Sequence, residues 1–524
     1  MDADVIVIGA GLAGIMAAGA ACDQGAKVLL LTRKTVGLAS NSAISNGVFA
    51  GPTNSYGPDA YIRDTLLIGK KLNSLPHIEA VAQGIVPAIS FLRDAGCTIV
   101  ESHENYMVKS ARPEVIPGLT LMKTLAASVQ ESQKLTVQVD FHVTDILSQD
   151  GQVCGVAAMD KAGRLLKLYA PAVILASGGA GAIYRRNDNQ KRALGQGYAM
   201  ALRAGLNLCD MEFVQFYPFV QAEPGIPSIL LYPPVPKSAR LINAAEEDLA
   251  AYYGLENLND MILKRRDDLS VLLHEAMRAG PVYMDYRRVP SESWMRPPLA
   301  MLAKLKFDFK NKPFAVAPAV HFFMGGIQTT ADTQTQLPGL FACGEVAWGL
   351  HGANRRGGNA LAECTVFGKI AGTHAAQWGL SHPLPRVGTE AHANSQSSRR
   401  SPTGASLRQL GRQIRDIAWS HAGVVRTGQG LRTGLTLLRK TEADIRAFAP
   451  RSVVETIDRS DQLGACLVLR TIFTASLARQ ESLGSFKRKE FPEEQEHSKY
   501  GNSSTGYDVG TDRISVSFIQ PAQC

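Results

Sequence analysis

The sequence predicts an α/β fold in which a doubly wound parallel sheet carries an inserted capping domain and is followed by a helical domain. The chain opens with an apolar run that ends at residue 8, a glycine turn, an alanine-rich segment and the run KVLLL, which is the order strand, turn, helix, strand. Between about 220 and 320, prolines and charged helical stretches replace this pattern. From 407 to 480 the periodicity is that of amphipathic helices.

The remaining elements follow in order along the chain. Helical periodicity at 75–96 and 119–134, and then short strands joined by glycine turns, extend the first domain. The stretch 381–406 is polar and rich in Ser and Pro, so we expect a linker or an exposed loop. The predicted parts are a sheet domain (1–219 and 326–385), an α+β capping domain (220–325), a helical domain (400–480) and a polar, irregular tail ending in the strand-like SVSFI (481–524).

Composition and charge narrow the class of function. The sequence has no run of about 18 apolar residues and starts directly on its first strand, so we expect a cytoplasmic protein that is not an integral membrane protein. Its 8 cysteines form no CxxC pair, which predicts no zinc or iron–sulfur site. The net charge of +8 is spread along the chain, so an anionic substrate or an acidic protein partner is favoured over nucleic acid.

The glycine turn carries the first functional signal. Gly9, Gly11 and Gly14 have GxGxxG spacing between a buried strand and a helix, which is typical of a Rossmann-like dinucleotide site with the pyrophosphate at the helix N-terminus. The acidic residue that usually ends the second strand is replaced by Thr32, Arg33 and Lys34. Such a basic pair could indicate NADP, but the motifs downstream decide against it.

Eight sequence blocks occur in an order that resembles the succinate dehydrogenase/fumarate reductase flavoprotein family, which includes the L-aspartate oxidases. The resemblance covers nearly the whole chain and implies FAD and an oxidoreductase. The blocks are 9–34, ASNSAISNGVFAG (39–51), LASGGAGAIY (175–184), RAGLNLCDMEFVQF (203–216), VHFFMGGIQT (320–329), GLFACGEVAWGLHGANRRGGNALAECTVFGKIAG (339–372), WSHAGVVRT (419–427) and ARQESLGSFKRKEFPE (478–493).

The resemblance also implies which residues hold FAD. Relatives place a Ser-Lys pair where this chain has Thr32, Arg33 and Lys34, and they use a glutamate at the place of Glu345 for ribitol or ribose hydroxyls. A helix that begins at Asn359, Ala360 and Leu361 should direct its positive end at the flavin N1 and O2. The other implied contacts are Ser40, Asn41, Ser42, Asn46 and Gly47 along the polar edge of the flavin, and Gly178 and Gly179 on the pyrophosphate side.

One departure concerns the attachment of the cofactor. Respiratory relatives bind FAD covalently through a histidine, and the corresponding residue here is Asn41. An amide cannot form that bond, so we expect noncovalent FAD.

The substrate site keeps part of the family pattern. His321 and Arg355 match two residues that clamp a dicarboxylate in relatives, and Arg355 can hold a carboxylate bidentately. A core histidine and a structural salt bridge are the competing interpretations. Relatives read QFHPT where this chain has Tyr217 and Phe219, so a carboxylate-binding histidine is lost.

Other family positions are also altered. Leu231, Tyr232 and Val235 stand opposite a Thr-Glu pair and an RGEGG turn, and Val271 opposite a proton-delivering arginine. A four-carbon diacid would leave its second carboxylate desolvated and unpaired, which costs several kcal/mol. Succinate, fumarate and aspartate are therefore not the expected substrates.

Three functions remain open. The first is oxidation or reduction of a C–C bond beside a carboxylate or acyl group on a longer or partly apolar substrate, with Tyr217, Tyr232 or Arg240 handling the proton. Tyr217 could instead only fill space in the core. The second is oxidation of an amino acid in the manner of an L-aspartate oxidase. The third is electron relay between partner proteins, and an iron–sulfur subunit is the partner that the resemblance implies.

Overall fold

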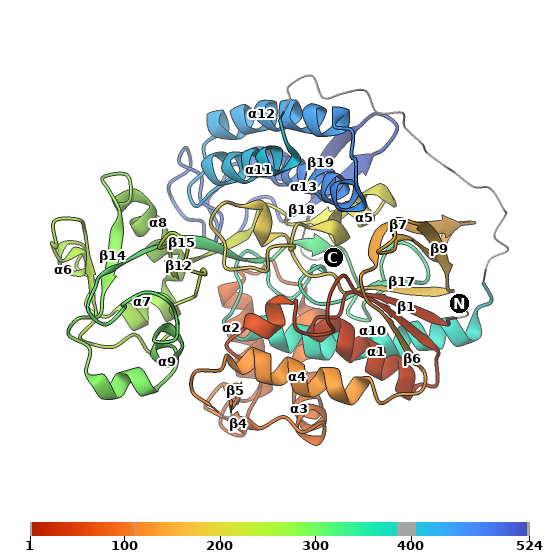
Figure 1. Cartoon of the computed structure of the whole chain (residues 1–524), viewed down its shortest axis with the longest axis horizontal. Helices are drawn as coiled ribbons and strands as arrows, with labels where there is room; N and C mark the ends of the chain where they lie inside the picture. The colour runs from red at the N-terminus through yellow and green to blue at the C-terminus, as the bar shows by residue number, and fades with distance from the viewer. Residues whose placement is uncertain (1–2, 111, 385–404, 521–524) are drawn as a thin grey trace.

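The computed structural model describes residues 3–110, 112–384 and 405–520, and it has the predicted α/β architecture with a separate cap and a helical C-terminal region. Figure 1 shows the cap, in green, on one side of the sheet domain. The C-terminal helices, in blue, lie above the sheet domain in the same view. Of the linker predicted at 381–406, residues 385–404 lie outside the described part.

The centre of the sheet domain is a five-stranded, fully parallel sheet in the order β17-β10-β1-β2-β6. Its three central strands are buried along their whole length, because helices and a second sheet cover both faces. The strands are β1 (Val5–Ile8), β2 (Val28–Leu31), β6 (Leu135–Gln138), β10 (Ala172–Leu175) and β17 (Leu340–Ala342).

Two helices, α1 (Leu12–Asp23) and α10 (Asn359–Ser381), pack closely against each other beside this sheet. Glycines make the approach possible: a Cβ on Gly372 would lie 2.2 Å from the carbonyl oxygen of Ala17. α10 begins at the wall of the cavity described below, and α1 begins beside Ser42, which also lines that cavity. The close packing therefore fixes the two helix ends relative to each other.

The rest of the sheet domain consists of helices and small sheets around this centre. The helices are α2 (Pro58–Ile68), α3 (Leu75–Asp94), α4 (Pro117–Val129) and α5 (Gln196–Arg203). The strands are β3 (Val48–Ala50), β4 (Ile99–Glu101), β5 (Asn105–Val108), β7 (His142–Gln149), β8 (Gln152–Met159) and β9 (Leu165–Tyr169). Short 3-10 helices lie at η1 (Asn41–Ile44) and η2 (Gly181–Ile183).

Among the described residues, α3 is the one helix that is long and apolar enough to cross a membrane. Its buried face packs against α2 and α10 inside the protein. A core helix passes the same test of length and composition, so the helix by itself is weak evidence for a membrane segment.

The cap is built on an antiparallel sheet in the order β12-β15-β14-β13, whose long strands also reach into the sheet domain. Its own apolar core holds Phe219, Leu231 and Val235. The strands are β12 (Val214–Gln221), β13 (Arg240–Ile242), β14 (Val282–Asp285) and β15 (Phe314–Phe323). The helices are α6 (Leu249–Tyr252), α7 (Leu258–Lys264), α8 (Arg266–Ala276), the 3-10 helix η3 (Ser291–Met295) and α9 (Leu299–Leu302).

The C-terminal region has three helices, α11 (Leu407–His421), α12 (Gly428–Ala447) and α13 (Val453–Ala478). The segment predicted as an irregular tail contains the expected strand within β19 (Arg513–Ile519), but also β18 (Asn502–Asp508). β18 joins a sheet with β11 (Leu208–Cys209) and β16 (Gly326–Ile327), so the end of the chain is built into the sheet domain.

Candidate active site

The glycine turn after β1 has the geometry of a dinucleotide site. Gly9 has φ +108°, and a Cβ there would lie 2.3 Å from the carbonyl oxygen of Ala176. A Cβ on Gly14 would lie 1.9 Å from the carbonyl oxygen of Gly9, so both positions require glycine. α1 begins after Gly11, which gives no side-chain cap; the N–H of Leu12 donates to the Ser42 hydroxyl at 3.3 Å, and the following N–H groups of the first turn face no side-chain cap and suit an anion.

The residues after β2 are held by other parts of the protein. Arg33 forms two hydrogen bonds of 2.7 and 2.9 Å with Asp461 of α13, and Lys34 pairs with Asp140 at 3.2 Å. Thr32 donates its hydroxyl to the carbonyl of Lys34 at 3.0 Å. None of the three lines the main cavity. Their predicted contact with FAD stays a prediction.

A cavity of about 1070 Å³ lies between the sheet domain and the cap. Its sheet-domain end is lined by most of the residues that we expect to face the flavin: Asn41, Ser42, Asn46, Gly47, Glu345, Ala360 and Leu361. Ser40 caps the η1 helix, and Gly178 (φ +74°) has open space at its Cβ position. Gly179 packs against Glu345, since a Cβ there would lie 2.2 Å from Oε1.

Two features of this end suit a bound flavin. α10 begins after Gly358 (φ +86°) without a side-chain cap, so its positive end faces the cavity, where Ala360 and Leu361 line the wall. Asn359 at the same end is buried, and its side-chain nitrogen has no hydrogen-bond partner within the described structure. Unpaired donors of this kind fit the polar edge of an isoalloxazine ring.

Asn41 forms hydrogen bonds through both polar atoms of its amide. Its nitrogen donates to Asn189 Oδ1 at 2.7 Å, and its oxygen accepts from the backbone N–H of Gln190 at 2.9 Å. The side chain thus connects the segment that we expect to face the flavin with the loop 187–190. It offers no nucleophile for a covalent bond to the cofactor.

Glu345 is buried beside this end of the cavity. Its carboxylate accepts from the backbone N–H of Phe323 at 3.2 Å, and burial raises its pKa to about 7. A carboxylate in such a place can accept hydrogen bonds from sugar or ribityl hydroxyls.

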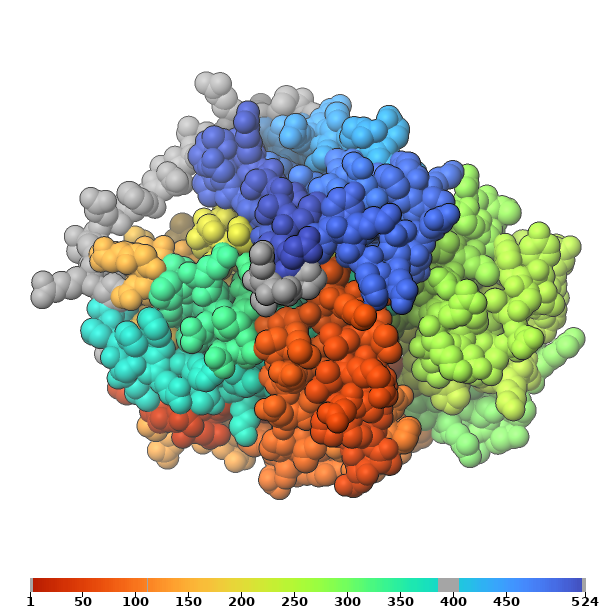
Figure 2. Space-filling view, turned by 180° about the vertical axis from the view of Figure 1, so that it is seen from behind, coloured from red at the N-terminus to blue at the C-terminus, as the bar shows by residue number. Residues whose placement is uncertain are grey.

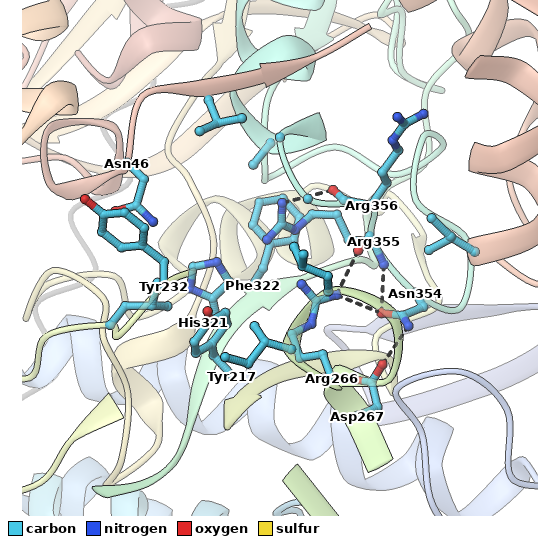
Figure 3. Close-up of a pocket in the computed structure, with 18 of the residues that line it drawn as sticks. Asn46, Tyr217, Tyr232, Arg266, Asp267, His321, Phe322, Asn354, Arg355 and Arg356 are labelled. Atoms are coloured by element: carbon cyan, nitrogen blue, oxygen red, sulfur yellow. Dashed lines mark hydrogen bonds between the residues drawn. The ribbon is translucent and has the colours of Figure 1, made fainter. Parts of the chain in front are cut away.

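The cap end of the cavity contains two arginines, Arg355, which is buried, and Arg266, which is half-buried (Figure 3). Arg355 donates to Gln215 Oε1 at 3.1 Å, and its guanidinium lies 4.6 Å from the ring centroid of Phe322. Arg266 donates to the carbonyl of Arg355 at 2.9 Å, and its Nε has no partner. In the described part of the chain, no carboxylate lies within ion-pair distance of either guanidinium. Burial lowers the pKa of Arg355 to about 9.

His321 lines the same cavity, beside the ring of Tyr217 at 5.7 Å between centroids. Its Nδ1 is 2.7 Å from Oδ2 of Asp188, whose side chain is only 8% exposed. Asp188 lines the same cavity. This hydrogen-bond partner of His321 was not foreseen from the sequence.

Tyr217 and Tyr232 form part of an apolar wall. The Tyr217 hydroxyl donates to the carbonyl of Leu231 at 3.3 Å, and burial raises its pKa well above the usual range. Burial raises the pKa of Tyr232 to about 12. The wall also includes Leu230, Pro233, Ile262 and Leu263.

The structure does not bring every expected catalytic residue to the cavity. Arg240 lies in β13, where it pairs with Asp248 at 3.5 Å and Asp285 at 3.8 Å, and it lines no part of the site. Val271 packs against the core, as an apolar residue should. The same helix nevertheless supplies an arginine, because Arg266 at its first turn points into the cavity. The spacing of RRDD before an amphipathic helix could have indicated it.

The fold and this cavity define an FAD-dependent oxidoreductase. The family model of the FAD binding domain matches residues 4–361, and that of the fumarate reductase flavoprotein C-terminal region matches 411–520. The chain belongs to the succinate dehydrogenase/fumarate reductase flavoprotein family, and its cofactor is FAD held without a covalent bond.

Individual relatives agree with this assignment. An L-aspartate oxidase of Agrobacterium fabrum is 31% identical and covers 93% of this chain and 91% of its own. A fumarate reductase flavoprotein subunit of Serratia is 32% identical and covers 76% of this chain and 72% of its own. The structure of E. coli quinol fumarate reductase superposes with a TM-score of 0.86 at 25% identity, covering 99% of this chain and 97% of the other.

Proposed function

We propose that the protein oxidises or reduces a C–C bond beside a carboxylate or acyl group, on a substrate with a longer or partly apolar body. The observation that carries this proposal is a pair of guanidiniums, of buried Arg355 and half-buried Arg266, which face the cavity with no carboxylate of the described residues paired to them. A buried cation without a counter-ion is costly, and a substrate carboxylate would supply the missing charge.

The residues that line the cavity would have separate roles in this reaction. FAD, when bound, accepts or donates a hydride. Arg355, held by Gln215 and stacked on Phe322, orients the substrate carboxylate, with Arg266 as the second cation. The apolar wall at Tyr232, Leu230 and Ile262 takes the rest of the substrate and excludes water. We retain Tyr232 as a contact and leave Arg240 without a role.

The proposal predicts discrimination against diacids. A second carboxylate placed on the apolar wall would lose several kcal/mol, so 3-phenylpropanoate should reduce the flavin at least about 100-fold more efficiently than succinate. The measurement is anaerobic bleaching of the flavin by saturated acids, and reoxidation of the reduced flavin by trans-cinnamate against fumarate. Rapid turnover of succinate would contradict the specificity, although the fold would stand.

Amino-acid oxidation is the second candidate. It is favoured by the Asp188 carboxylate in the cavity, which could hold a substrate ammonium, and by the similarity to L-aspartate oxidases. Release of hydrogen peroxide and ammonia from an amino-acid panel would support it. Flavin bleaching by acids that carry no amine would support the first function.

We also propose that electrons leave through a separate protein subunit in the cytoplasm. Relatives are named as subunits of fumarate reductases, and exposed basic residues on α11 and α12 offer a docking face. These residues are Arg408, Arg412, Arg432, Arg439 and Lys440. Capture of an iron–sulfur protein that weakens as salt rises would support such docking, and unchanged capture would argue against this face.

A further inference from the structure

The feature that the proposed function leaves unused is the outer end of the apolar wall. Leu263 of α7 is 70% exposed and Leu67 of α2 is 58% exposed, yet both line the cavity. A side chain that is open to solvent and also lines a cavity lies at the mouth of that cavity. Exposed apolar residues that gather at the mouth of a binding cavity indicate a surface that a ligand covers.

The apolar wall is continuous from the interior of the cavity to this mouth. At its inner end Tyr217 is buried, and its hydroxyl donates to the carbonyl of Leu231 at 3.3 Å. Asn259 of α7 connects the segment 230–235 with the helix, because its side chain accepts from the N–H of Val235 at 2.6 Å and donates to the Val235 carbonyl at 3.0 Å. This segment and α7 therefore form one surface. Its residues in the cavity are Leu230, Tyr232, Pro233, Ile262 and Leu263.

A series of ion pairs places the two exposed leucines at the same mouth. Lys70, which is close to Leu67 in the chain, pairs with Glu494 at 2.9 Å. Lys487 pairs with Glu494 and lies 4.0 Å from Asp268 of α8, the helix that directly follows α7. Because these charges are paired with one another, the exposed leucines are free to give a ligand an apolar contact at this opening.

The chemistry of the wall favours a hydrocarbon over a polar body. Leu230, Pro233 and Ile262 have no polar side-chain atoms, and Tyr217 already donates its hydroxyl to the protein. A polar group of the substrate placed there would lose its water without gaining a partner. A fatty acid has no polar atom between its carboxylate and its far end, so it avoids this penalty.

We propose that the substrate is a fatty acid, whose unbranched chain follows the cap wall and emerges between Leu263 and Leu67. The inference rests on the proposed function for the position of the carboxylate at Arg355, and it names the class of substrate. With the carboxylate held in the interior, the chain has the wall beside it as far as the mouth. A short acid would leave both leucines in contact with water.

A series of trans-2-enoates of increasing length tests how far the bound chain extends. These acids are already unsaturated at the reacting bond, so the oxidised, FAD-loaded enzyme binds them without turnover. The four-, six-, eight- and ten-carbon acids are titrated below their micellar concentrations, and binding is followed by the flavin absorbance and by calorimetry. Each added methylene should raise the affinity about 2- to 4-fold until the chain leaves the mouth. Affinity that does not rise beyond trans-2-butenoate would overturn the proposal.

A long diacid distinguishes a chain that ends in solvent from one that ends inside the protein. The second carboxylate of trans-2-decenedioate would reach the mouth and stay hydrated, whereas that of fumarate would lie on the buried wall. Trans-2-decenedioate should therefore bind within about 10-fold of trans-2-decenoate, while fumarate should bind at least about 100-fold more weakly than trans-2-butenoate. Rejection of the long diacid as strong as that of fumarate would contradict an open outer end.

Leu263→Lys should change the preference between these two long ligands. The new ammonium can pair with the second carboxylate of trans-2-decenedioate, and it removes an apolar contact of trans-2-decenoate. The ratio of the diacid affinity to the monoacid affinity should therefore rise about 10-fold. Leu67→Lys repeats the test from the other side of the mouth. A purely structural role of the two leucines would lower both affinities alike, and an unchanged ratio in both variants would refute the proposed path of the chain.

Two further variants serve as controls. Leu165→Lys is the matched control for charge, because Leu165 in β9 is also 70% exposed but does not line the cavity. It should leave the ratio at the native value, and an equal rise in this variant would count against the proposal. Arg355→Met should weaken trans-2-butenoate and trans-2-decenoate by the same factor of at least about 10. Unchanged affinity for trans-2-decenoate would mean that the chain binds without its carboxylate in the site, contrary to the proposal.

These binding measurements do not depend on turnover, so they separate this inference from the proposed function. If no saturated acid reduces the flavin, the proposed function fails, and the length series still decides whether the wall binds a hydrocarbon chain. If 3-phenylpropanoate reduces the flavin while the length series is flat, the proposed function stands and this inference fails. Self-association that is lost in Leu263→Lys, together with a flat series, would assign the leucines to an interface between two copies of the chain.

Discussion

At the scale of single residues, the cavity combines charged groups that the protein leaves unpaired with polar groups that it ties down. Arg355 and Arg266 face the cavity without a counter-ion among the described residues, whereas Asn41 and Tyr217 form hydrogen bonds with other parts of the protein. A ligand can stabilise polar groups that have no partner in the protein. The hydrogen bonds of the cavity residues therefore indicate where the substrate binds better than their residue types alone do.

Tyr217→Phe tests whether the phenol takes part in catalysis. Its hydroxyl donates a long bond of 3.3 Å to a backbone carbonyl, and burial keeps it neutral. We expect turnover within about 3-fold of the native enzyme, an unchanged pH profile, and a loss of unfolding free energy of about 1 kcal/mol or less. A shifted pH profile would return the proton-donor role to Tyr217.

Glu345 makes the stability of the apoprotein depend on pH. Its pKa is about 7 in the folded protein and near 4.5 when unfolded, so the folded state binds more protons between these values. The unfolding free energy should therefore fall as pH rises from about 4.5 to 7, by at most about 1.4 kcal/mol per pH unit, and level off above. Thermal melts of apoprotein should show this slope, and Glu345→Gln should reduce it, since the amide oxygen can still accept from Phe323.

At the scale of elements, the parallel sheet and the glycine turn could be predicted because each depends on local residues. Apolar runs bury a strand wherever they occur, and the GxGxxG spacing marks the turn, in which Gly9 has φ +108° and Gly14 lies against the carbonyl of Gly9. The further contact of Gly9 with Ala176 is distant in the chain and could not be read from the spacing. The partner of His321 could not be predicted, because Asp188 is 133 residues away and is brought there by a loop attached to β15. β18 was missed because its sequence, NSSTGYD, is polar and becomes a strand through pairing with β11.

The contact between α1 and α10 predicts opposite effects for two helix glycines. Gly372→Ala places a methyl group 2.2 Å from the Ala17 carbonyl oxygen, so it should force the helices apart and cost about 1–3 kcal/mol. A Cβ on Gly19 of α1 would lie 3.7 Å from its nearest neighbour, a methyl group of Val129, which is an ordinary van der Waals contact. Gly19→Ala should therefore raise the unfolding free energy by about 0.5–1 kcal/mol. Chemical denaturation measures both, and equal effects of the two changes would refute the packing argument.

At the scale of the whole molecule, the cavity depends on three parts of the chain that meet around it. Figure 2 shows the cap, the C-terminal region and the orange N-terminal segment meeting on one face of the protein. The contact includes Lys70 and Glu494 at 2.9 Å, and Lys487, which pairs with Glu494 and lies 4.0 Å from Asp268 of the cap helix α8. All four residues line the cavity, so substrate access and the position of the C-terminal segment are connected.

The C-terminal region is held to the sheet domain by Arg479, which is fully buried. It pairs with Glu212 and Glu481 at 2.6 Å each and lies 3.7 Å from Asp210. Arg479→Met would leave three carboxylates buried without their shared cation, and the loss of one partner of a buried pair costs about 3–5 kcal/mol. We expect that loss in chemical denaturation, together with weaker FAD retention, because the cavity loses one of its walls.

The matched control for Arg479→Met is Arg278→Met, which removes an exposed pair with Glu275 and should cost less than about 1 kcal/mol. If the C-terminal region were an independent attachment, Arg479→Met would produce a second unfolding transition with FAD still bound. A single, lower transition that coincides with release of FAD would show that the three parts form one cooperative unit. The burial of the charged cluster between β11 and α13 argues for that result, since its charges cannot be hydrated unless both parts separate.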